Sequence, residues 1–591
     1  MPRSEANKLL QVKNLVTSFE AGEGQLNAVN NISFDMYRGQ VVALVGESGS
    51  GKSVTGLSIM RLVEHRGGSI DSGEILFLSD GISFDLTNFD EHQMRTIRGR
   101  SISMIFQDPM TSLNPALHCG YQIKEIVKLH LKYNEKKAHA HVLELLDQVG
   151  ITEPVLAMKK YPHEFSGGQL QRILIAMSIS CNPQLVIADE PTTALDAVVR
   201  SKILEVLKQV QKKRNLAILF ITHDLDSVQH FADEILVMYA GKIVERGLVK
   251  NIFHEPEHPY TKGLLACRPP RTGRYYFLPT ISDFMRISND GKDLESSVNL
   301  SDVFKDLRIS DSSRNMQLKK IYSSNPLLTT TNIYKTYNKS RGVFKTRGEF
   351  HAVHNVSFNL FKGETLGLVG ASGCGKSTLA RCLVNLEQKD GGKVMMMDQE
   401  TFELEELGSL NEIGHDIQYI FQDPYSSLSP RMTIGEALLE ALNAHPTIKT
   451  KQEKQNRINE LLIQVGLKPY HFHRYPHEFS GGQRQRICIA RALLLEPRVI
   501  ICDEAVSALD VSVQAQVLNL LNELKYEYGL SYIFISHDLN VVRYMSDRIL
   551  VMENGRIIEE GESDQLLKYP QKEYTKELVL ATQDLKLVLS E

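Results

Sequence analysis

The sequence lacks the features of a membrane-spanning, secreted or disulfide-bonded chain. It has no uninterrupted apolar run of about 18 residues, so we expect no transmembrane helix of its own. The N-terminus, Met1-Pro2-Arg3-Ser4-Glu5, continues into mixed polar residues and has no apolar signal core. The seven cysteines are scattered and include no Cys-x-x-Cys pair. An odd, dispersed set argues for a reducing compartment and against a disulfide framework or a zinc site.

An excess of charge of one sign is also missing. The chain has 67 Lys and Arg against 71 Asp and Glu, a formal net charge of −4. This balance provides neither the basic footprint of a nucleic-acid-binding protein nor a polybasic patch for an anionic membrane surface. Hydrophobic content of 42% and charged content of 23% are ordinary for a soluble globular protein. A length of 591 residues leaves room for roughly three to five domains.

What the sequence does contain is an internal repeat. The nine residues Tyr161-Pro162-His163-Glu164-Phe165-Ser166-Gly167-Gly168-Gln169 return unchanged as Tyr475-Pro476-His477-Glu478-Phe479-Ser480-Gly481-Gly482-Gln483. In each copy an acidic pair follows 23 residues after the serine (189 − 166 and 503 − 480). The chain therefore consists of one functional unit written twice, and its organisation has to be interpreted from the repeat.

A phosphate-loop pattern precedes the repeated stretch in the first copy. The apolar, β-branched run 41–45 predicts a strand buried on both faces of a sheet. It leads into Gly46-Glu47-Ser48-Gly49-Ser50-Gly51-Lys52-Ser53, and a helix is expected over 54–62. Backbone N–H groups of such a loop wrap a phosphate chain, Lys52 would reach the β- and γ-phosphates, and the Ser53 hydroxyl would join a Mg²⁺ shell.

Further candidate residues follow along the first copy. Gln107 comes after an apolar run, and its recurrence as Gln422 favours a functional over an ordinary surface role. Taken alone, Ser166 most simply caps a helix over 170–179, and a helix is also expected within 121–150. The strands 185–188 and 217–221 end in Asp189-Glu190 and His223. At the carboxyl ends of parallel strands these side chains can hold Mg²⁺, polarise a water and contact a γ-phosphate.

The second copy repeats each of these positions after a polar linker, which we place at 271–326 and expect to contain at most one short helix and no chemistry. The strand 366–369 leads into Gly370-Ala371-Ser372-Gly373-Cys374-Gly375-Lys376-Ser377, and Gln422, Ser480, Asp503, Glu504 and His537 follow. From the serine to the histidine the offset between copies is constant at 314 (480 − 166 and 537 − 223). No net insertion therefore separates these elements.

With these motifs the chain resembles the ATP-binding subunits of ABC transporters, with two nucleotide-binding domains fused in one polypeptide. The repeated stretch contains what resembles the ABC signature, and Gln107 and Gln422 resemble the Q-loop glutamines. Ala194-Leu195-Asp196 and Ala508-Leu509-Asp510 are similar to D-loops, and Phe19 and Tyr337 are the candidates for stacking on adenine. The resemblance implies an α/β fold: two P-loop ABC-type ATPase domains in tandem, over 1–270 and 327–591. Each would have a mainly parallel sheet core, a helical subdomain and an antiparallel β subdomain.

The resemblance also implies roles for the residues. ATP and Mg²⁺ would be the cofactors, with metal contacts from Ser53, Gln107, Asp189, Ser377, Gln422 and Asp503. Glu190 and Glu504 would orient or deprotonate the attacking water, and His223 and His537 would contact the γ-phosphate. In this family each ATP lies against the phosphate loop of one domain and the signature of the other. Ser480 to Gln483 would then complete the site built on Lys52, and Ser166 to Gln169 the site built on Lys376. No catalytic position is lost in either copy, so we expect two hydrolytic sites.

Within that family the chain is similar to the oligopeptide and dipeptide importer branch. His258-Pro259-Tyr260-Thr261 resembles the His-Pro-Tyr-Thr element of that branch, whereas the second copy has only Tyr574-Thr575. Some members carry an iron–sulfur cluster after this element; because only Cys267 lies nearby, we expect none.

The branch implies two permease subunits and a solute-binding protein as partners, no nucleic acid, pairing of the two ATPase domains within the chain, and a peripheral position on the cytoplasmic face of the inner membrane. A soluble tandem ABC ATPase acting on ribosomes or DNA, and a peptide exporter, are the alternatives. A scaffold with inactive sites is disfavoured because every catalytic position is retained. The substrate is not readable from this chain, since peptides, nickel, glutathione and other small solutes are carried by related systems.

Overall fold

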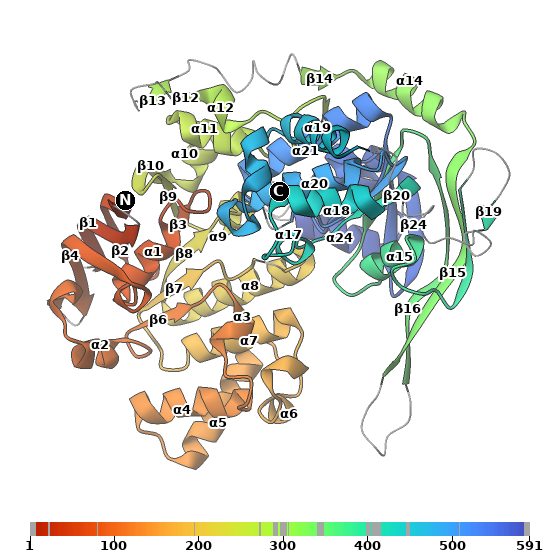
Figure 1. Cartoon of the computed structure of the whole chain (residues 1–591). Coiled ribbons are helices and arrows are strands. Elements are labelled where there is room, and N and C mark those ends of the chain that lie inside the picture. Colours follow the sequence, from red (N-terminus) through yellow and green to blue (C-terminus); the bar gives the residue numbers. More distant parts are fainter. Residues whose placement is uncertain are drawn as a thin grey trace. The chain divides into compact units, whose positions relative to one another are not determined.

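The computed structural model of the chain describes residues 7–21, 24–79, 81–193, 195–270, 273–287, 293–295, 304, 307–339, 348–396, 402–403, 415–444, 450–507 and 509–583. It divides into two compact units (Figure 1). The first comprises Met1–Leu195, Val199–Leu265 and Ile281–Ser297, and the second comprises Asp196–Val198, Ala266–Thr280 and Val298–Glu591. Each copy of the sequence repeat thus supplies most of one unit.

Two sheets form the framework of the first unit. An antiparallel sheet has the order β2 (Gly24–Tyr37), β1 (Lys8–Ala21), β4 (Gly68–Ser79) and β5 (Ile82–Asp85). The second sheet has the order β10 (Lys242–Leu248), β9 (Glu234–Tyr239), β3 (Val41–Val45), β8 (Ala217–Thr222), β7 (Leu185–Asp189) and β6 (Ile102–Ile105). Its strands run parallel except β10, which pairs antiparallel with β9. The carboxyl ends of β3, β7 and β8 therefore meet at one edge of the sheet.

The strand expected over 41–45 is confirmed, and both of its faces are buried. Val42 and Leu44 belong to a core shared with the antiparallel sheet. Val41, Ala43 and Val45 belong to a second core, formed with the helices. A strand buried on both sides has no polar face, which explains why its sequence is a continuous apolar run rather than an alternating one.

Helices cover the parallel sheet and form a separate helical region. The helix after the phosphate loop is α1 (Lys52–Ile59), which begins two residues earlier than expected. The expected 121–150 helix is two helices, because the chain turns at Lys132 with φ 55° and restarts at the Asn134 cap. The bounds of this group are α2 (Glu91–Ile97), α3 (Pro109–Ser112), α4 (Cys119–Leu131), α5 (Glu135–Gln148), α6 (Pro154–Ala157) and α7 (Gly167–Ser178). Later helices are α8 (Ala197–Arg214), α9 (Leu225–Phe231), α10 (Val249–His254) and α11 (Pro259–Ala266).

The second unit repeats this plan. Its antiparallel sheet has the order β16 (Gly348–Phe361), β15 (Pro326–Lys339), β18 (Gly391–Met396) and β19 (Phe402–Glu403). Its larger sheet has the order β20 (Ile417–Ile420), β21 (Val499–Asp503), β22 (Ser531–Ile535), β17 (Thr365–Val369), β23 (Arg548–Glu553) and β24 (Arg556–Glu562). The helices are α15 (Lys376–Leu383), α17 (Pro424–Ser427), α18 (Ile434–Ala444), α19 (Lys451–Gln464), α20 (Gly481–Leu493), α21 (Val511–Tyr528), α22 (Leu539–Met545), α23 (Ser563–Lys568) and α24 (Glu573–Gln583).

The linker has more structure than its polar composition indicates. Its elements are β11 (Arg274–Tyr275), α12 (Ile281–Phe284), β12 (Met285–Ile287), β13 (Asp293–Glu295), β14 (Arg308–Ile309) and α14 (Asp311–Tyr322). β11 pairs with β14, and β12 pairs with β13. The other linker positions, 271–272, 288–292, 296–303 and 305–306, lie outside the described residues.

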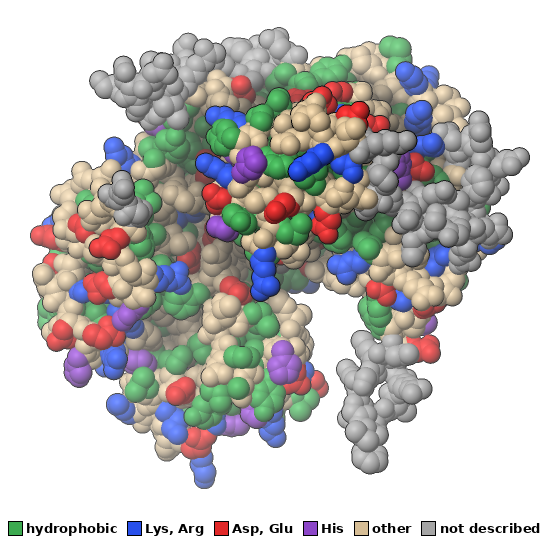
Figure 2. All heavy atoms as spheres, viewed as in Figure 1, with side chains coloured by type: hydrophobic (Ala, Val, Ile, Leu, Met, Phe, Trp, Pro, Cys, Tyr) green, Lys and Arg blue, Asp and Glu red, His purple; other side chains and the backbone are tan. Residues whose placement is uncertain are grey.

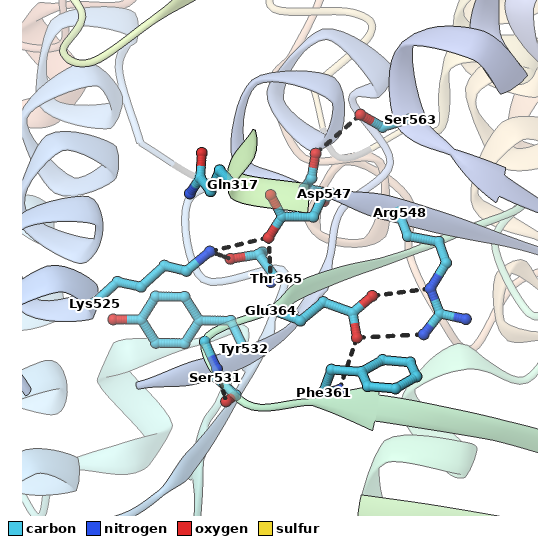
Figure 3. Close-up of polar contacts among 12 residues, drawn as sticks. Gln317, Phe361, Glu364, Thr365, Lys525, Ser531, Tyr532, Asp547, Arg548 and Ser563 are labelled. Atoms are coloured by element: carbon cyan, nitrogen blue, oxygen red, sulfur yellow. Dashed lines mark hydrogen bonds and ion pairs between the residues drawn. The ribbon is translucent and has the colours of Figure 1, made fainter. Parts of the chain in front are cut away.

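Two linker arginines enter a buried ionic cluster of the second unit. Asp547, 2% exposed, receives hydrogen bonds from Arg314 Nη1 at 2.5 Å, Lys525 Nζ at 3.1 Å and the Thr365 N–H at 2.7 Å. Figure 3 shows Lys525 and Thr365 converging on this carboxylate. Burial would raise the pKa of Asp547, but Lys525 and Arg314 outweigh it and hold the pKa well below its usual range. The second linker arginine, Arg274, donates to Asp564 Oδ2 at 2.9 Å.

No helix among the described residues is long and apolar enough to cross a bilayer. On the face drawn in Figure 2, blue and red side chains are interspersed. The mixed pattern of this face agrees with the near-balanced charge of the sequence.

Candidate functional site

The phosphate loop of the first unit joins β3 to α1. Gly51, at the N-cap of α1, has φ 102°, and a Cβ there would lie 2.2 Å from the Ala28 carbonyl oxygen. Only glycine fits this backbone and this contact. Lys52 is 4% exposed, and its Nζ donates to the Glu47 carbonyl at 2.7 Å. The loop therefore gathers its own lysine and the N-terminus of α1 at one place.

The expected metal-binding pair comes together beside this loop. Ser53 Oγ donates to Asp189 Oδ1 at 2.9 Å, although the two residues are 136 positions apart. Asp189 ends β7 and is 5% exposed. Burial is the main cause that raises the pKa of Asp189 to about 6, and the neighbouring Glu190 adds to it. A hydroxyl and a carboxylate are oxygen ligands of the kind that Mg²⁺ prefers.

Glu190, the next residue, lies between two expected partners. Gln107 Nε2 donates to its Oε2 at 3.1 Å, and His223 Nδ1 lies 3.1 Å from its Oε1. The Glu190 backbone is left-handed at φ 47°, and its N–H donates to the Ile221 carbonyl at 2.8 Å. Burial would raise the pKa of Glu190, but the bond from His223 and its charge hold the pKa below its usual value. The predicted glutamine, glutamate and histidine therefore form one cluster.

The second unit builds the same arrangement from its own residues. Ser377 Oγ donates to Asp503 Oδ1 at 3.0 Å, and Gln422 Nε2 donates to Glu504 Oε2 at 2.8 Å. His537 Nδ1 lies 3.5 Å from Glu504 Oε2. The Glu504 backbone is again left-handed, at φ 49°. Burial raises the pKa of Asp503, whereas His537 holds the pKa of Glu504 below its usual value against the effect of burial.

One residue of the second cluster escaped the sequence analysis. Tyr419, on β20, donates its hydroxyl hydrogen to Asp503 Oδ2 at 2.5 Å. With the offset of the Q-loop glutamines (422 − 107 = 315), the corresponding residue of the first copy is Met104. The two predicted metal carboxylates therefore have different hydrogen-bond partners. Comparing the two copies directly would have revealed this difference, because it falls three residues before each glutamine.

The signature serines cap helices, as the local sequence predicted. Ser166 Oγ accepts the Gln169 N–H at 3.4 Å, and Gln169 Oε1 accepts the Ser166 N–H at 3.2 Å. Ser480 and Gln483 make the same reciprocal pair at 3.4 and 3.1 Å. The glycines of each signature occupy the first turn of α7 and α20. These helix N-termini have the free N–H groups that can face an anion.

The remaining expected residues lie on the units as follows. Phe19 lies in β1 beside Gly68. A Cβ added at Gly68 would lie 2.8 Å from the Phe19 ring. Tyr337 lies in β15 and is 38% exposed. Adenine stacking by either aromatic stays a prediction. In the D-loop segments, Ala194 and Ala508 lie outside the described residues.

A glycine-rich loop between a buried parallel strand and a helix, with a serine–aspartate pair and a glutamate–histidine pair, defines a phosphate-loop ATPase. This arrangement is present once in each unit. It also agrees with the expected α/β fold of two tandem ATPase domains, each with a mainly parallel core sheet and an antiparallel sheet.

Comparison with known proteins identifies the family. A model described as ABC transporter matches residues 29–193 and 353–507, and one described as Oligopeptide/dipeptide transporter, C-terminal region matches residues 244–285. The glutathione import ATP-binding protein GsiA of Pectobacterium atrosepticum is 44% identical over 97% of this chain and 89% of its own length. GsiA of Escherichia coli (strain K12) is 44% identical over 98% of this chain and 91% of its own length.

A solved structure, the dimeric post-hydrolysis state of the ATP-binding cassette MJ0796 bound to ADP and Pi, is 30% identical to this chain. The match covers 40% of this chain and 98% of the chain in that structure, with a TM-score of 0.36.

The chain belongs to the ABC transporter family, in the oligopeptide/dipeptide-type import branch. It is an ATP-binding ATPase that powers an uptake transporter, and its partners are membrane permeases. These findings favour uptake over the soluble-factor and exporter alternatives.

Proposed function

We propose that this chain hydrolyses ATP at two sites to power the uptake of small peptides of the glutathione class. It would work at the cytoplasmic face of the inner membrane with two permease subunits and a solute-binding protein. The observation that carries the two-site part is the recurrence of one cluster in both units, Ser53–Asp189 with Gln107–Glu190–His223 and its counterpart on Asp503 and Glu504. A site that had lost its function would be free to lose these contacts.

The residues of each cluster would divide the work as follows. Lys52 and Lys376 would leave the loop carbonyls that they contact and pair with the phosphates. Glu190 and Glu504 would orient a water and accept its proton as its oxygen attacks the γ-phosphorus and the bond to ADP breaks. The depressed pKa values of both glutamates keep them ionised and able to accept that proton. His223 and His537, which lie beside Glu190 and Glu504, would contact the γ-phosphate.

The residues present also fit Mg²⁺. Ser53 with Asp189, and Ser377 with Asp503, offer hard oxygen ligands beside each phosphate loop. Among the described residues there is no group of three or more His, Cys, Asp or Glu that could hold a metal by itself. A small protein ligand set suits Mg²⁺, which usually keeps several waters and is shared with substrate phosphates. When bound, this ion would neutralise phosphate charge. Gln107 and Gln422, each hydrogen-bonded to the glutamate of its own cluster, would be its further oxygen ligands.

Glutamine substitution of the two glutamates tests the ATPase assignment. Glu190→Gln and Glu504→Gln remove the proton acceptor and keep the shape of the side chain. Each should therefore lower the rate of ATP hydrolysis at its own site by about 10²- to 10⁴-fold. The double variant should have almost no ATPase activity in purified chain, while the exposed Glu205→Gln serves as the matched control. If either single change leaves ATPase and transport rates unaltered, two-site function is wrong.

Uptake measurements test the substrate. A strain without this gene should lose uptake of labelled glutathione or dipeptides, and the wild-type chain should restore it. The Glu190→Gln/Glu504→Gln chain should not restore it. If the wild-type chain restored uptake of a different solute, such as nickel, and not of peptides, the proposed substrate class would be wrong and the ATPase assignment would be unaffected.

A further inference from the structure

The segment that follows each ATPase core reaches back to the phosphate loop of the same unit. In the first unit, the Glu47 backbone N–H donates to the Tyr260 hydroxyl oxygen at 3.1 Å, across 213 residues of sequence. In the second unit, the Ala371 N–H donates to the Tyr574 hydroxyl oxygen at 2.7 Å. Glu47 and Ala371 are the second residues of the two loops. The same bond is therefore made twice from independent parts of the chain.

The support for each tyrosine is repeated as well. Glu245 of β10 accepts the backbone N–H groups of Glu257 and His258, at 2.9 and 3.0 Å, just before α11. Glu559 of β24 accepts those of Gln571 and Lys572, at 2.8 and 3.1 Å, just before α24. A carboxylate that accepts two backbone N–H groups fixes the chain at the point where the helix begins. The tyrosine, two residues after the second anchored N–H, is held in place by that anchor.

The bond from Tyr574 to the phosphate loop is not evident from the sequence of the second copy, where the family pattern is incomplete. The oligopeptide/dipeptide transporter C-terminal model matches residues 244–285 of the first copy. The second copy has Lys572-Glu573 in place of His258-Pro259 and keeps the tyrosine and threonine. The glutamate and the tyrosine, which make the contacts, are thus the parts that both copies share. The histidine and proline are not required for the bond to the loop.

Each tyrosine contacts the residue whose carbonyl holds the loop lysine. The Glu47 N–H is bonded to Tyr260, and its carbonyl accepts from Lys52 Nζ at 2.7 Å. The Ala371 N–H is bonded to Tyr574, and its carbonyl accepts from Lys376 Nζ at 3.0 Å. When the lysine turns to the phosphates it would release this carbonyl, which keeps the backbone N–H of Ser50 in the first loop and of Cys374 in the second. The tyrosine bond would hold the N–H of the same residue, on the preceding peptide unit.

We propose that Tyr260 and Tyr574 are positioning residues that hold the phosphate loop of their own unit in its ATP-binding shape. The inference rests on the proposed roles of the two loops. Tyr260 is fully buried and packs against Tyr239 with ring centroids 4.5 Å apart and the ring planes tilted by 37°, so its hydroxyl has little freedom to move away. Burial raises the pKa of Tyr574 to about 12, and its hydroxyl therefore stays neutral at physiological pH.

Equilibrium binding of a fluorescent ATP analogue to the full chain tests the proposal. In a Lys376→Ala background, which leaves the first loop intact, Tyr260→Phe should raise the Kd about three- to tenfold, the loss expected for one neutral hydrogen bond. In the Lys52→Ala background, Tyr574→Phe should have an effect of similar size. In the otherwise unchanged chain both variants should raise KM for ATP and keep kcat within about twofold.

A matched control separates positioning from general destabilisation. Tyr532 is fully buried in the second unit, and its hydroxyl donates to the Leu521 carbonyl at 2.9 Å, outside the phosphate loop. Because Tyr532 is fully buried and Tyr574 only partly buried, Tyr532→Phe should lower the unfolding temperature at least as much as Tyr574→Phe and leave the Kd for ATP unchanged. Unchanged Kd values in Tyr260→Phe and Tyr574→Phe, or an equal rise in Tyr532→Phe, would overturn the proposal. A parent variant that binds no ATP analogue would instead overturn the proposed sites themselves.

Discussion

Arg274 should hold the linker to the second unit, and its replacement by methionine would measure that attachment. The side chain donates to Asp564 at 2.9 Å, to the Tyr544 carbonyl at 3.2 Å and to the Ser546 carbonyl at 2.9 Å, and it also contacts the Ser563 hydroxyl. It is 9% exposed. Arg274→Met keeps much of the length and apolar contact of the side chain and removes all of these hydrogen bonds.

The expected loss can be worked from these contacts. Breaking a buried ion pair by removing one partner costs about 3–5 kcal/mol. Here the cost should lie at or below the lower limit, about 2–3 kcal/mol, because Asp564 keeps Arg543 at 2.7 Å and is 31% exposed to screening water. For a unit of this size, about 2 °C per kcal/mol applies, so the unfolding temperature of the second unit should fall by roughly 5 °C.

Scanning calorimetry is the suitable assay, since the chain has no tryptophan to report unfolding by fluorescence. Arg308→Met is the matched control, because Arg308 lies in the same linker and is exposed. Burial would raise the pKa of Asp564, but Arg274 and Arg543 hold it below its usual value. The contribution is therefore present above the unfolded pKa of about 3.9 and should shrink as the pH falls below it. Equal midpoints for the two variants at pH 7 would refute the attachment.

Three further predictions test the sites. Asp189→Asn should raise the free energy of unfolding by up to about 3 kcal/mol at pH 7–8 and abolish hydrolysis at its site. The cost of ionising this carboxyl, whose pKa is raised from 3.8 to about 6, develops between these two pH values and is fully present above pH 6. Calorimetry should therefore show the full gain at pH 8 and little gain at pH 4. Tyr419→Phe removes a bond that lowers the pKa of Asp503, so the acid limb of the ATPase pH profile should move to higher pH, and an unchanged profile would count against this. Ser480→Ala should impair hydrolysis at the site built on Lys52, and Ser166→Ala should impair hydrolysis at the site built on Lys376. In a Lys52→Ala chain, Ser480→Ala should therefore cause no further loss of ATPase activity. A further loss there, with none in a Lys376→Ala chain, would exclude the expected pairing.

The parts of the site that the sequence predicted are those set by local pattern and topology. An apolar, β-branched run before Gly46 and another before Asp189 predicted strands buried on both faces, and parallel strands bring their carboxyl ends to one edge. Ser53 and Asp189 were therefore expected near each other, whereas the contact of Gln107 with Glu190 was expected from the family resemblance. Helix α1 begins two residues before its expected start, because the phosphate loop itself supplies the N-cap, Gly51, and the helix starts at Lys52.

The contacts that the sequence did not predict are single pairs between distant residues. Arg274 lies in a polar, weakly periodic stretch that has the composition of a solvated surface, and its partner Asp564 is 290 residues later. Nothing in the local pattern distinguishes a buried, paired arginine from an exposed one. The copies offer a clue only when compared position by position. Lys250 stands in the first copy where Asp564 stands in the second, so only the second copy has an acidic partner there.

The same comparison explains why Tyr574 was the weaker match by sequence and an equal match by structure. Family patterns weigh every position of His258-Pro259-Tyr260-Thr261, but the bond to the phosphate loop needs one hydroxyl and one anchoring carboxylate. Lys572 and Glu573 change the residues around that bond and leave its two ends in place. Duplication therefore separates what the ATPase unit needs from what one copy has kept. A contact retained on a diverged background, as at Tyr574, supports a role for this bond in the ATPase unit independently of the nine repeated residues.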